Sequence, residues 1–212
     1  TQPGTVLQRM LREDIHKTML RIAIPVMAVV ASVWLGYQFW RLIWGSEPIW
    51  PTSPIGAGDL LLRYDEVQRW FSGKPVYSAL GTAAYPPASM VLLWPLLGWL
   101  DAASARWLWA IATLAALGWL IVLLIRESGA DTSLERFFIA LIPLAIYPTG
   151  ATIGNGQIII LLFPALAAGF VLLKKSPPGW RRDLMAAALM IITLVKPSVS
   201  VPFFWVLIFM PG

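Results

Sequence analysis

The sequence lacks cysteine, contains a single histidine and has few charged residues for its length. The absence of cysteine excludes disulfides and thiolate metal sites, and one histidine cannot form a metal-binding cluster. Only 13% of the 212 residues are charged, whereas 58% are hydrophobic. Soluble domains have about 25% charged residues. The composition therefore indicates a membrane protein that crosses the bilayer several times.

Nucleotide-binding motifs are also missing. The sequence contains no P-loop, Rossmann glycine fingerprint or zinc signature, which argues against a nucleotide-using enzyme. The net charge of +5 does not indicate nucleic acid, because the cations cluster between apolar segments, as in loops that face anionic lipid and the cytoplasm. The 12 tryptophans favour membrane–water interfaces. We therefore expect membrane lipids, and no nucleic acid, among the partners.

Long apolar segments predict an all-α, polytopic helical bundle. A helix needs about 20 apolar residues to cross the hydrocarbon core. The predicted spans are residues 22–44, 105–125, 137–153, 157–173 and 184–195, and the beginning of another at 198–210. Residues 1–21 are predicted to form a cytoplasmic segment, and residues 22–212 a membrane-embedded module. Because the chain does not begin with Met and stops inside an apolar run, we expect it to be part of a longer protein.

The positive residues set the predicted orientation. Cations before the first span place the N-terminus in the cytoplasm, so the long loop at residues 45–104 falls on the outer face. The apolar run 86–100 is about 15 residues long, at the short limit for a crossing. If it crossed, the later basic loop around Lys174 and Arg181 would lie outside, against the positive-inside rule. We predict instead a re-entrant or interfacial helix, and an amphipathic helix at residues 60–71.

Asp59 stands at the beginning of that amphipathic helix, after Gly56-Ala57-Gly58. A connection as long as this loop, about 40 residues, is usually functional or disordered, and its aromatic and apolar content argues against disorder. Asp59 is expected either to cap the helix, since Asp is a favoured N-cap, or to serve as a general base that takes a proton from a substrate hydroxyl. The two roles can coexist.

Further charged residues follow along the same helix. Asp59 and Glu66 share a helix face, as a pair of carboxylates or a shared cation site would require, and Glu66 and Asp65 are the second-choice acids. A solvated helix face gives the same pattern. Arg63 and Arg69 are expected either to bind phosphate or to anchor the helix at lipid headgroups.

Three motifs elsewhere carry polar side chains to the predicted outer face. Tyr85, before Pro86-Pro87, fixes an extended entry into a helix, and its ring is a candidate lining of a sugar site. Asn155 and Gln157 belong either to a plain turn or to a cavity lining, because an amide at membrane depth needs a partner. Lys196 is expected either to reach lipid headgroups or to neutralise a phosphate leaving group.

Together these motifs resemble glycosyltransferase family 87, polytopic membrane enzymes of the GT-C superfamily. The resemblance covers roughly residues 20–205 and rests on the order of several short motifs, namely the acid after the first span, Gly73-Lys74-Pro75-Val76-Tyr77, Tyr85-Pro86-Pro87, Pro95-Leu96, Gly156-Gln157 and Lys196-Pro197. Members of the family are longer, so the resemblance implies that this chain is the N-terminal half of a GT-C-like fold.

The resemblance implies an inverting transfer of a mannose-like sugar or a pentose from a polyprenyl-phosphate donor to a lipid or glycan acceptor. The reaction would take place on the outer face of the plasma or inner membrane. Asp59 matches the family's general base. Tyr64 matches a substrate-binding tyrosine but lies one residue further from the acid, which leaves Asp65 as a second-choice base. The need for a divalent metal stays open.

Two other classes of function fit the same pattern. A transporter or flippase for a lipid-linked or anionic substrate would use broken helices with polar turns, and would place its polar groups near the midplane of the bilayer. A non-catalytic membrane scaffold would not require an acid, an amide and a lysine on one face. We therefore predict an enzyme, with the transporter as the alternative.

Overall fold

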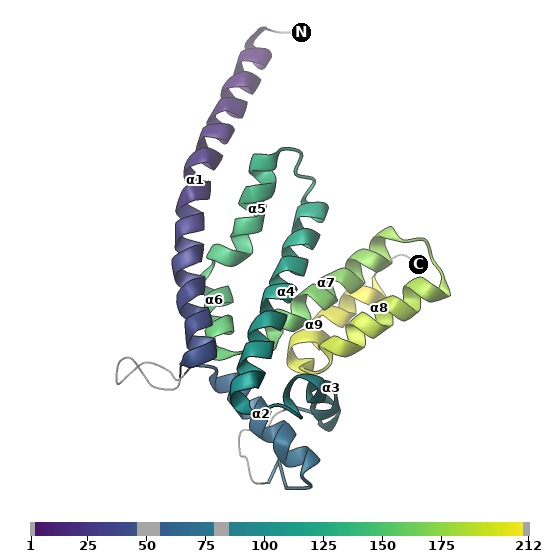
Figure 1. Ribbon diagram of the computed structural model, residues 1–212. Helices are drawn as coiled ribbons and strands as arrows, with labels where there is room; N and C mark the ends of the chain where they lie inside the picture. The colour runs from purple at the N-terminus through teal and green to yellow at the C-terminus, as the bar shows by residue number, and fades with distance from the viewer. Residues whose placement is uncertain (1–2, 46–55, 79–84, 210–212) are drawn as a thin grey trace.

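The computed structural model describes residues 3–45, 56–78 and 85–209, which form a bundle of helices (Figure 1). No β-strand occurs within these ranges, which confirms the predicted all-α class. Residues 46–55 and 79–84 of the predicted outer loop lie outside the described residues. Two helices are long and apolar enough to cross a membrane, or three if one bent pair counts as a single span.

The first candidate span belongs to α1 (Pro3–Trp44), a helix of 42 residues. Its segment Lys17–Trp44 is long and apolar enough to cross, in agreement with the span predicted at residues 22–44. The helix is continuous across residue 21. The basic N-terminal segment is therefore a helical extension of the first span.

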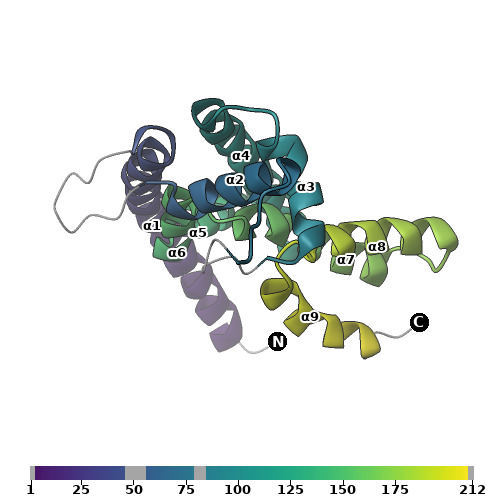
Figure 2. The ribbon, with the colours of Figure 1, turned by 90° about the horizontal axis from the view of Figure 1, so that it is seen from below.

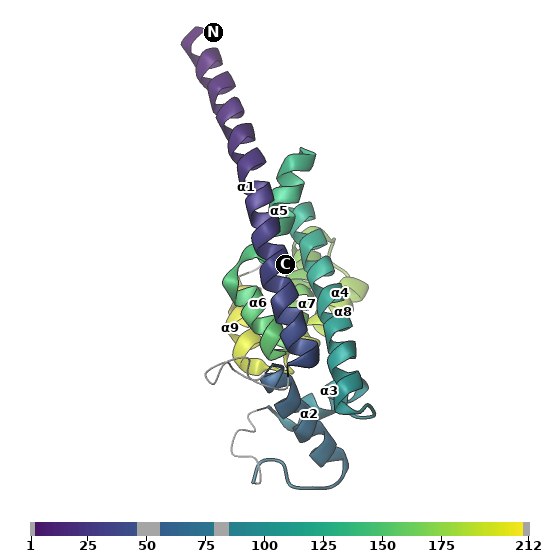
Figure 3. The same cartoon turned by 60° about the vertical axis from the view of Figure 1, so that its left-hand side comes forward.

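α2 (Gly58–Phe71) and α3 (Pro87–Leu97) lie across one end of the bundle, as the view along the long helices shows (Figure 2). Figure 3 shows them as a separate layer beneath the other helices. Helix α3 has proline at its first position, where the missing N–H costs no helical hydrogen bond. The end of α1 and the beginning of α4 meet at this same end (Figure 1). The segment between them therefore does not cross the bundle, as predicted for residues 86–100.

The second candidate span is α4 (Ala102–Ser128). It begins at Asp101, whose Oδ1 accepts hydrogen bonds of 3.0 Å from the N–H groups of Ala103 and Ser104. It ends before Gly129, whose φ of 69° is the left-handed conformation that glycine adopts without steric cost. The predicted span 105–125 is thus confirmed, with three residues more at each end.

The span predicted at residues 137–153 is wrong in one respect, because the structure divides it. α5 (Ser133–Ala145) and α6 (Tyr147–Asn155) meet at a bend of 51°. Ile146 between them is extended, and Pro148 in the first turn of α6 lacks the N–H that a continuous helix would need. A capping box starts α5, because the side chain of Thr132 accepts from the backbone of Glu135 while the carboxylate of Glu135 accepts from the backbone of Thr132.

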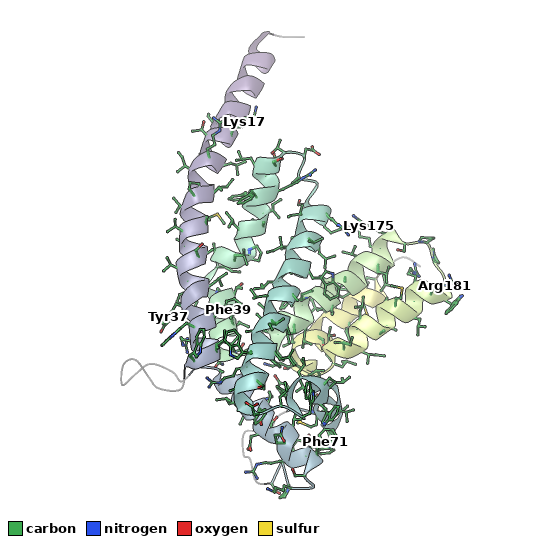
Figure 4. All side chains as sticks on the ribbon, in the orientation of Figure 1. Lys17, Tyr37, Phe39, Phe71, Lys175 and Arg181 are labelled. Carbon is green, nitrogen blue, oxygen red and sulfur yellow. The ribbon has the colours of Figure 1, made fainter. Side chains whose placement is uncertain are left out.

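The last three helices are α7 (Ile159–Lys175), α8 (Trp180–Thr193) and α9 (Pro197–Ile208). They overlap the segments predicted as spans at 157–173, 184–195 and 198–210, although residue 210 lies outside the described residues. None of the three is among the helices long and apolar enough to cross a membrane, so their prediction as complete spans is not confirmed. α7 packs against α4 and α8. Figure 4 shows Lys17, Lys175 and Arg181 away from the end that carries Phe71. The labelled basic residues and the α2–α3 layer therefore occupy different parts of the molecule.

Arg106 ties the α2–α3 layer to the bundle. Its side chain, on the second turn of α4, is largely buried and donates to the backbone carbonyls of Ile43 (3.2 Å), Gly45 (3.3 Å) and Gly56 (3.4 Å). These carbonyls lie at the end of α1 and just before α2. Because a charged donor satisfies several buried carbonyls here, the beginning of α2 is held in place.

Candidate active site

Helix α2 is held on α3 by one of its faces. The hydroxyl of Tyr64 donates to the carbonyl of Leu100 (2.9 Å), and the side-chain amide of Gln68 donates to the carbonyl of Leu97 (2.8 Å). Tyr64 thus anchors the helix in this structure, and its substrate-binding role stays a prediction. The anchoring presents a different face of α2, with Asp59, Arg63 and Glu66 at spacings of four and three residues, toward the interior.

Arg63 and Glu66 form a buried ion pair. The Nη1 of Arg63 lies 2.6 Å from the Oε2 of Glu66, and these side chains are 4% and 0% exposed. Burial raises the pKa of Glu66; Arg63 opposes this effect, while the carboxylates of Asp59 and Asp65 add to it. The solvated-face reading of this helix is therefore wrong for Glu66, because the α2–α3 packing covers it.

Tyr85 lies between two cations that come from distant parts of the chain. The guanidinium carbon of Arg63 is 4.2 Å from the centre of the Tyr85 ring, and the Nζ of Lys196 is 5.7 Å from it. Both distances are within the range of cation–π attraction. The ring is thus the point where the first half of α2, the entry to α3 and the α8–α9 joint come together.

Two hydrogen bonds hold this arrangement. The hydroxyl of Tyr77 donates to the carbonyl of Tyr85 (2.7 Å) and the hydroxyl of Ser89 donates to the carbonyl of Val195 (2.7 Å), the residue before Lys196. The sequence analysis missed the role of Ser89. A serine in the first turn of an apolar helix gives no sign of its partner along the sequence, because the two residues are more than 100 positions apart.

The pKa of Tyr85 is affected by the charge of Asp59. The Tyr85 side chain is buried, and its hydroxyl has no hydrogen-bond partner among the described residues. Burial raises the pKa of Tyr85, and the negative charge of Asp59 is the second cause. Asp59 therefore lies close enough to Tyr85 for its charge to be felt there.

The expectation that Asp59 caps the helix is wrong. Helix α2 begins one residue earlier, at Gly58, and its N-cap residue is Ala57, without a side-chain cap. The N–H of Ala57 donates to the carbonyl of Gly154 (2.8 Å), which fixes the entry of the chain. Asp59 lies in the first turn, where a carboxylate is favoured by the helix dipole. It is half-buried, and its Oδ2 is buried without a hydrogen-bond partner in the described part of the chain.

Asp65, the other second-choice acid, points elsewhere. Its carboxylate is 2.9 Å from the Nε of Arg69, and these side chains are about half and one-third exposed, at 49% and 34%. This pair is a solvated ion pair on the outer side of α2, so the solvated-face interpretation holds for Asp65. The roles predicted for Arg69, phosphate binding or headgroup anchoring, stay predictions. Neither residue is part of the Asp59–Arg63–Glu66 face.

A pocket of about 390 Å³ opens beside Tyr85. Its lining comes from the α2–α3 connection and from the α8–α9 joint, namely Tyr77, Tyr85, Pro86, Pro87, Lys196, Pro197 and Ser198. We call it the Tyr85 pocket. Lys196 is the cation on its wall. Arg63, only 3% exposed, lies behind the ring of Tyr85 rather than on the wall.

Asn155 and Gln157 lie on a second pocket, of about 670 Å³, between α1 and α6. We call it the α1–α6 pocket. Asn155 still lies at the beginning of α2, because its Oδ1 packs against Gly58, the residue before Asp59. The predicted convergence on one end of the bundle is therefore present, but it is divided between two neighbouring pockets. Among the described residues, no three His, Asp or Glu side chains come together in a way that could hold a metal ion.

These features define the class of the protein: an all-helical membrane protein whose buried acid, cations and aromatic ring gather beside two pockets at one end of the bundle. A family model, glycosyltransferase family 87, matches residues 83–207, more than half of the chain. The chain therefore belongs to glycosyltransferase family 87, which indicates a membrane glycosyltransferase and favours the enzyme over the transporter. No curated protein and no solved structure matches it.

The matched range includes some candidate site residues and excludes others. Tyr85, Asn155, Gln157 and Lys196 lie within it. The face of α2 that carries Asp59 lies before it. The assignment of Asp59 therefore depends on its place on the face of α2 that packs on Tyr85 through Arg63, and not on the family match.

Proposed function

We propose that this protein transfers a sugar, mannose-like or a pentose, from a polyprenyl-phosphate donor to a hydroxyl of a lipid or glycan acceptor. The transfer takes place at the outer face of the cell membrane and inverts the anomeric centre. One observation carries the proposal: the half-buried Asp59 shares a face of α2 with Arg63, whose guanidinium carbon lies 4.2 Å from the centre of the Tyr85 ring, and that ring also contacts Lys196 on the wall of a pocket. A cation on the wall of a cavity and an acid on the neighbouring helix suit a reaction that removes a proton and releases a phosphate.

Asp59 is favoured as the general base over the other acids of α2. Glu66 is fully buried and paired with Arg63, so it is not free to reach a substrate. Asp65 is paired with Arg69 on the solvated side of the helix. Asp59 has a carboxylate oxygen that is buried without a partner in the described part of the chain, as does Glu66, but Asp59 is only half-buried and has no ion pair that would hold it away from a hydroxyl.

In the proposed step, the acceptor hydroxyl attacks the anomeric carbon of the donor sugar. Its oxygen forms the new glycosidic bond while its proton passes to Asp59. The bond between the anomeric carbon and the phosphate oxygen breaks, and its electron pair leaves with the polyprenyl phosphate. The sugar ring carries positive charge in the transition state, as in glycoside hydrolysis.

Lys196 is placed to offset the negative charge that develops on the leaving phosphate. It is the cation on the wall of the Tyr85 pocket, and Pro197 at the beginning of α9 follows it directly. Arg63 supports this charge from behind the ring of Tyr85. A fixed cation near a developing charge lowers the barrier because no solvent has to reorganise around it.

Helix α3 provides an apolar surface for the lipid chain of the donor. Its first residues line the Tyr85 pocket, and further along it Val91, Leu92 and Trp94 are 59%, 43% and 42% exposed. A lipid-linked donor also agrees with the absence of nucleotide-binding motifs from the sequence.

The test uses the full-length protein in membranes, incubated with radiolabelled polyprenyl-phosphate mannose and with the corresponding arabinose donor. Asp59→Asn keeps the shape of the side chain but removes its basicity. We expect it to lower the rate of transfer by about 10²- to 10⁴-fold, the usual contribution of a general base. The matched control is Asp65→Asn on the solvated side of α2, which should transfer at close to the native rate. Transfer by Asp59→Asn at the native rate would refute the assignment.

A further inference from the structure

The α1–α6 pocket has no part in the proposed chemical step, yet it is the larger of the two pockets described above. It opens between the C-terminal half of α1 and the short helix α6. Its walls combine three aromatic side chains and three amides, namely Trp34, Tyr37, Tyr147, Gln38, Asn155 and Gln157. Gln38 accepts a hydrogen bond from Arg41, which also lines the pocket (2.9 Å). The other two amides need an explanation, because an amide among apolar helices is costly unless it has a partner.

The pocket is shaped by close packing of α1 on α6. Gly150 and Gly154 are one helical turn apart on α6, and a side chain at either would collide with Trp34 or with Gln38 on α1. This spacing of small residues lets two helix backbones approach closely. The indole N–H of Trp34 also donates to the carbonyl of Tyr147 (3.4 Å). The walls of the pocket are therefore fixed in relation to each other.

The aromatic rings give the pocket a flat apolar surface. The rings of Trp34 and Tyr147 stack, with centroids 5.2 Å apart and an angle of 23° between their planes. Tyr147 is 70% exposed, so much of its surface is free for a ligand. A flat ring surface suits the C–H face of a sugar, and it also suits an acyl chain. The ring surface alone therefore does not distinguish a sugar from an acyl chain.

The amides of the pocket favour a saccharide over an acyl chain. Within the described part of the chain, the side chains of Asn155 and Gln157 make no hydrogen bond to another protein group. Each amide offers an acceptor oxygen and two N–H donors. A saccharide, whose hydroxyls both donate and accept, can satisfy these groups. An acyl chain would leave them unpaired, at a cost of about 1–3 kcal/mol for each buried group.

We propose that the α1–α6 pocket binds a saccharide, with its apolar face on the Trp34–Tyr147 stack and its hydroxyls on Asn155 and Gln157. Asn155 packs against Gly58, beside Asp59, so a sugar in this pocket lies next to the base. If Asp59 is the base, as in the function proposed above, this sugar is that of the acceptor. Saccharide binding itself does not depend on that assignment.

Binding is tested on the full-length protein in lipid nanodiscs by saturation-transfer NMR. The probes are methyl α-mannopyranoside, methyl arabinofuranoside and their disaccharides. Gln157→Leu removes one amide at nearly constant volume and should weaken binding about three- to tenfold, the effect of one lost hydrogen bond. Tyr147→Ala should weaken it by a similar factor. The matched control is Trp180→Ala, which removes an aromatic ring that is equally exposed, at 71%, but lies on α8.

Each outcome decides the proposal. Binding that weakens in Gln157→Leu and Tyr147→Ala but not in Trp180→Ala supports it. No binding by any probe, or binding that these changes leave intact, overturns it.

In the transfer assay, Gln157→Leu should raise the KM for the acceptor. A raised KM for the donor would assign the saccharide to the donor instead. Asp59→Asn should still bind the probes. If Asp59→Asn also transfers normally, the proposed base is wrong, while the binding data still decide the saccharide site.

Discussion

Ser89 in the first turn of α3 is bonded to Val195 at the α8–α9 joint, with a distance of 2.7 Å from the hydroxyl to the carbonyl. Ser89 is 1% exposed and Val195 is 3% exposed, so water does not compete for this bond. The next residue is Lys196, which contacts the ring of Tyr85. The bond therefore joins the two segments that form the Tyr85 pocket, and it sets the position of the pocket's cation.

Ser89→Ala should lower transfer while leaving the protein folded. The change leaves the carbonyl of Val195 without its partner and should destabilise the fold by about 1–3 kcal/mol. We expect a larger KM for the polyprenyl-phosphate donor, because Lys196 is less well held. Steady-state kinetics and thermal unfolding in detergent measure the two effects. Ser72→Ala is the control, since the Ser72 hydroxyl also donates to a carbonyl at 2.7 Å but is exposed. If the two variants behave alike, Ser89 does not position the lysine.

Glu66→Gln should change the dependence of stability on pH. Burial raises the pKa of Glu66 above its ordinary value of 4.5, so the folded protein holds this proton more tightly than the unfolded chain does. That contribution to the free energy of unfolding is complete below pH 4.5 and is lost as pH rises through the folded-state pKa. The glutamine variant has no such proton and lacks this decrease.

The measurement is the unfolding temperature of both proteins in detergent between about pH 4 and about pH 8. The control is Asp183→Asn, which removes an exposed carboxylate on α8 that does not act on Glu66, and it should keep the native profile. A Glu66→Gln profile parallel to that of the native protein would show that the Glu66–Arg63 pair is not buried as described.

Much of the fold follows from the sequence, because long apolar runs and helix-ending residues are local signals. The spans at 22–44 and 105–125 and the amphipathic helix before Phe71 were all predictable in this way. The break between α5 and α6 was missed, although Tyr147-Pro148 stands in the middle of the run. A proline inside an apolar segment either bends a helix or is tolerated, and packing against α1 decides between the two.

The candidate site was only partly predictable. Charge patterning puts Asp59, Asn155 and Lys196 at one end of the bundle, and the structure places all three there. The sequence does not show that Tyr85 joins the acid to the lysine, or that Asn155 belongs to a separate pocket. These are contacts between residues far apart in the chain, and their choice depends on which faces of the helices meet.

Arg106→Met should be strongly destabilising. The substitution keeps much of the apolar stem but removes the donor that serves three backbone carbonyls near the beginning of α2. Hydrogen bonds from charged groups contribute about 1.5–3 kcal/mol, so we expect a loss of about that size in the free energy of unfolding. The control on the same helix is Arg126→Met, where the side chain is exposed at the other end of α4. Equal effects of the two changes would contradict the role given to Arg106.

The orientation of the protein can be measured directly because these 212 residues contain no cysteine, so a thiol introduced among them is the only site for a maleimide within this part of the protein. Lys74→Cys lies in the exposed turn after α2, and Asp131→Cys in the exposed turn between α4 and α5, at opposite ends of α4 (Figure 1). Basic residues such as Arg126 favour the cytoplasmic side. An impermeant maleimide should therefore label Lys74→Cys in intact cells, and Asp131→Cys only after permeabilisation. The same protein without the introduced thiol gives the background labelling under each condition. The reverse pattern would put Asp59 and the Tyr85 pocket in the cytoplasm and exclude transfer at the outer face.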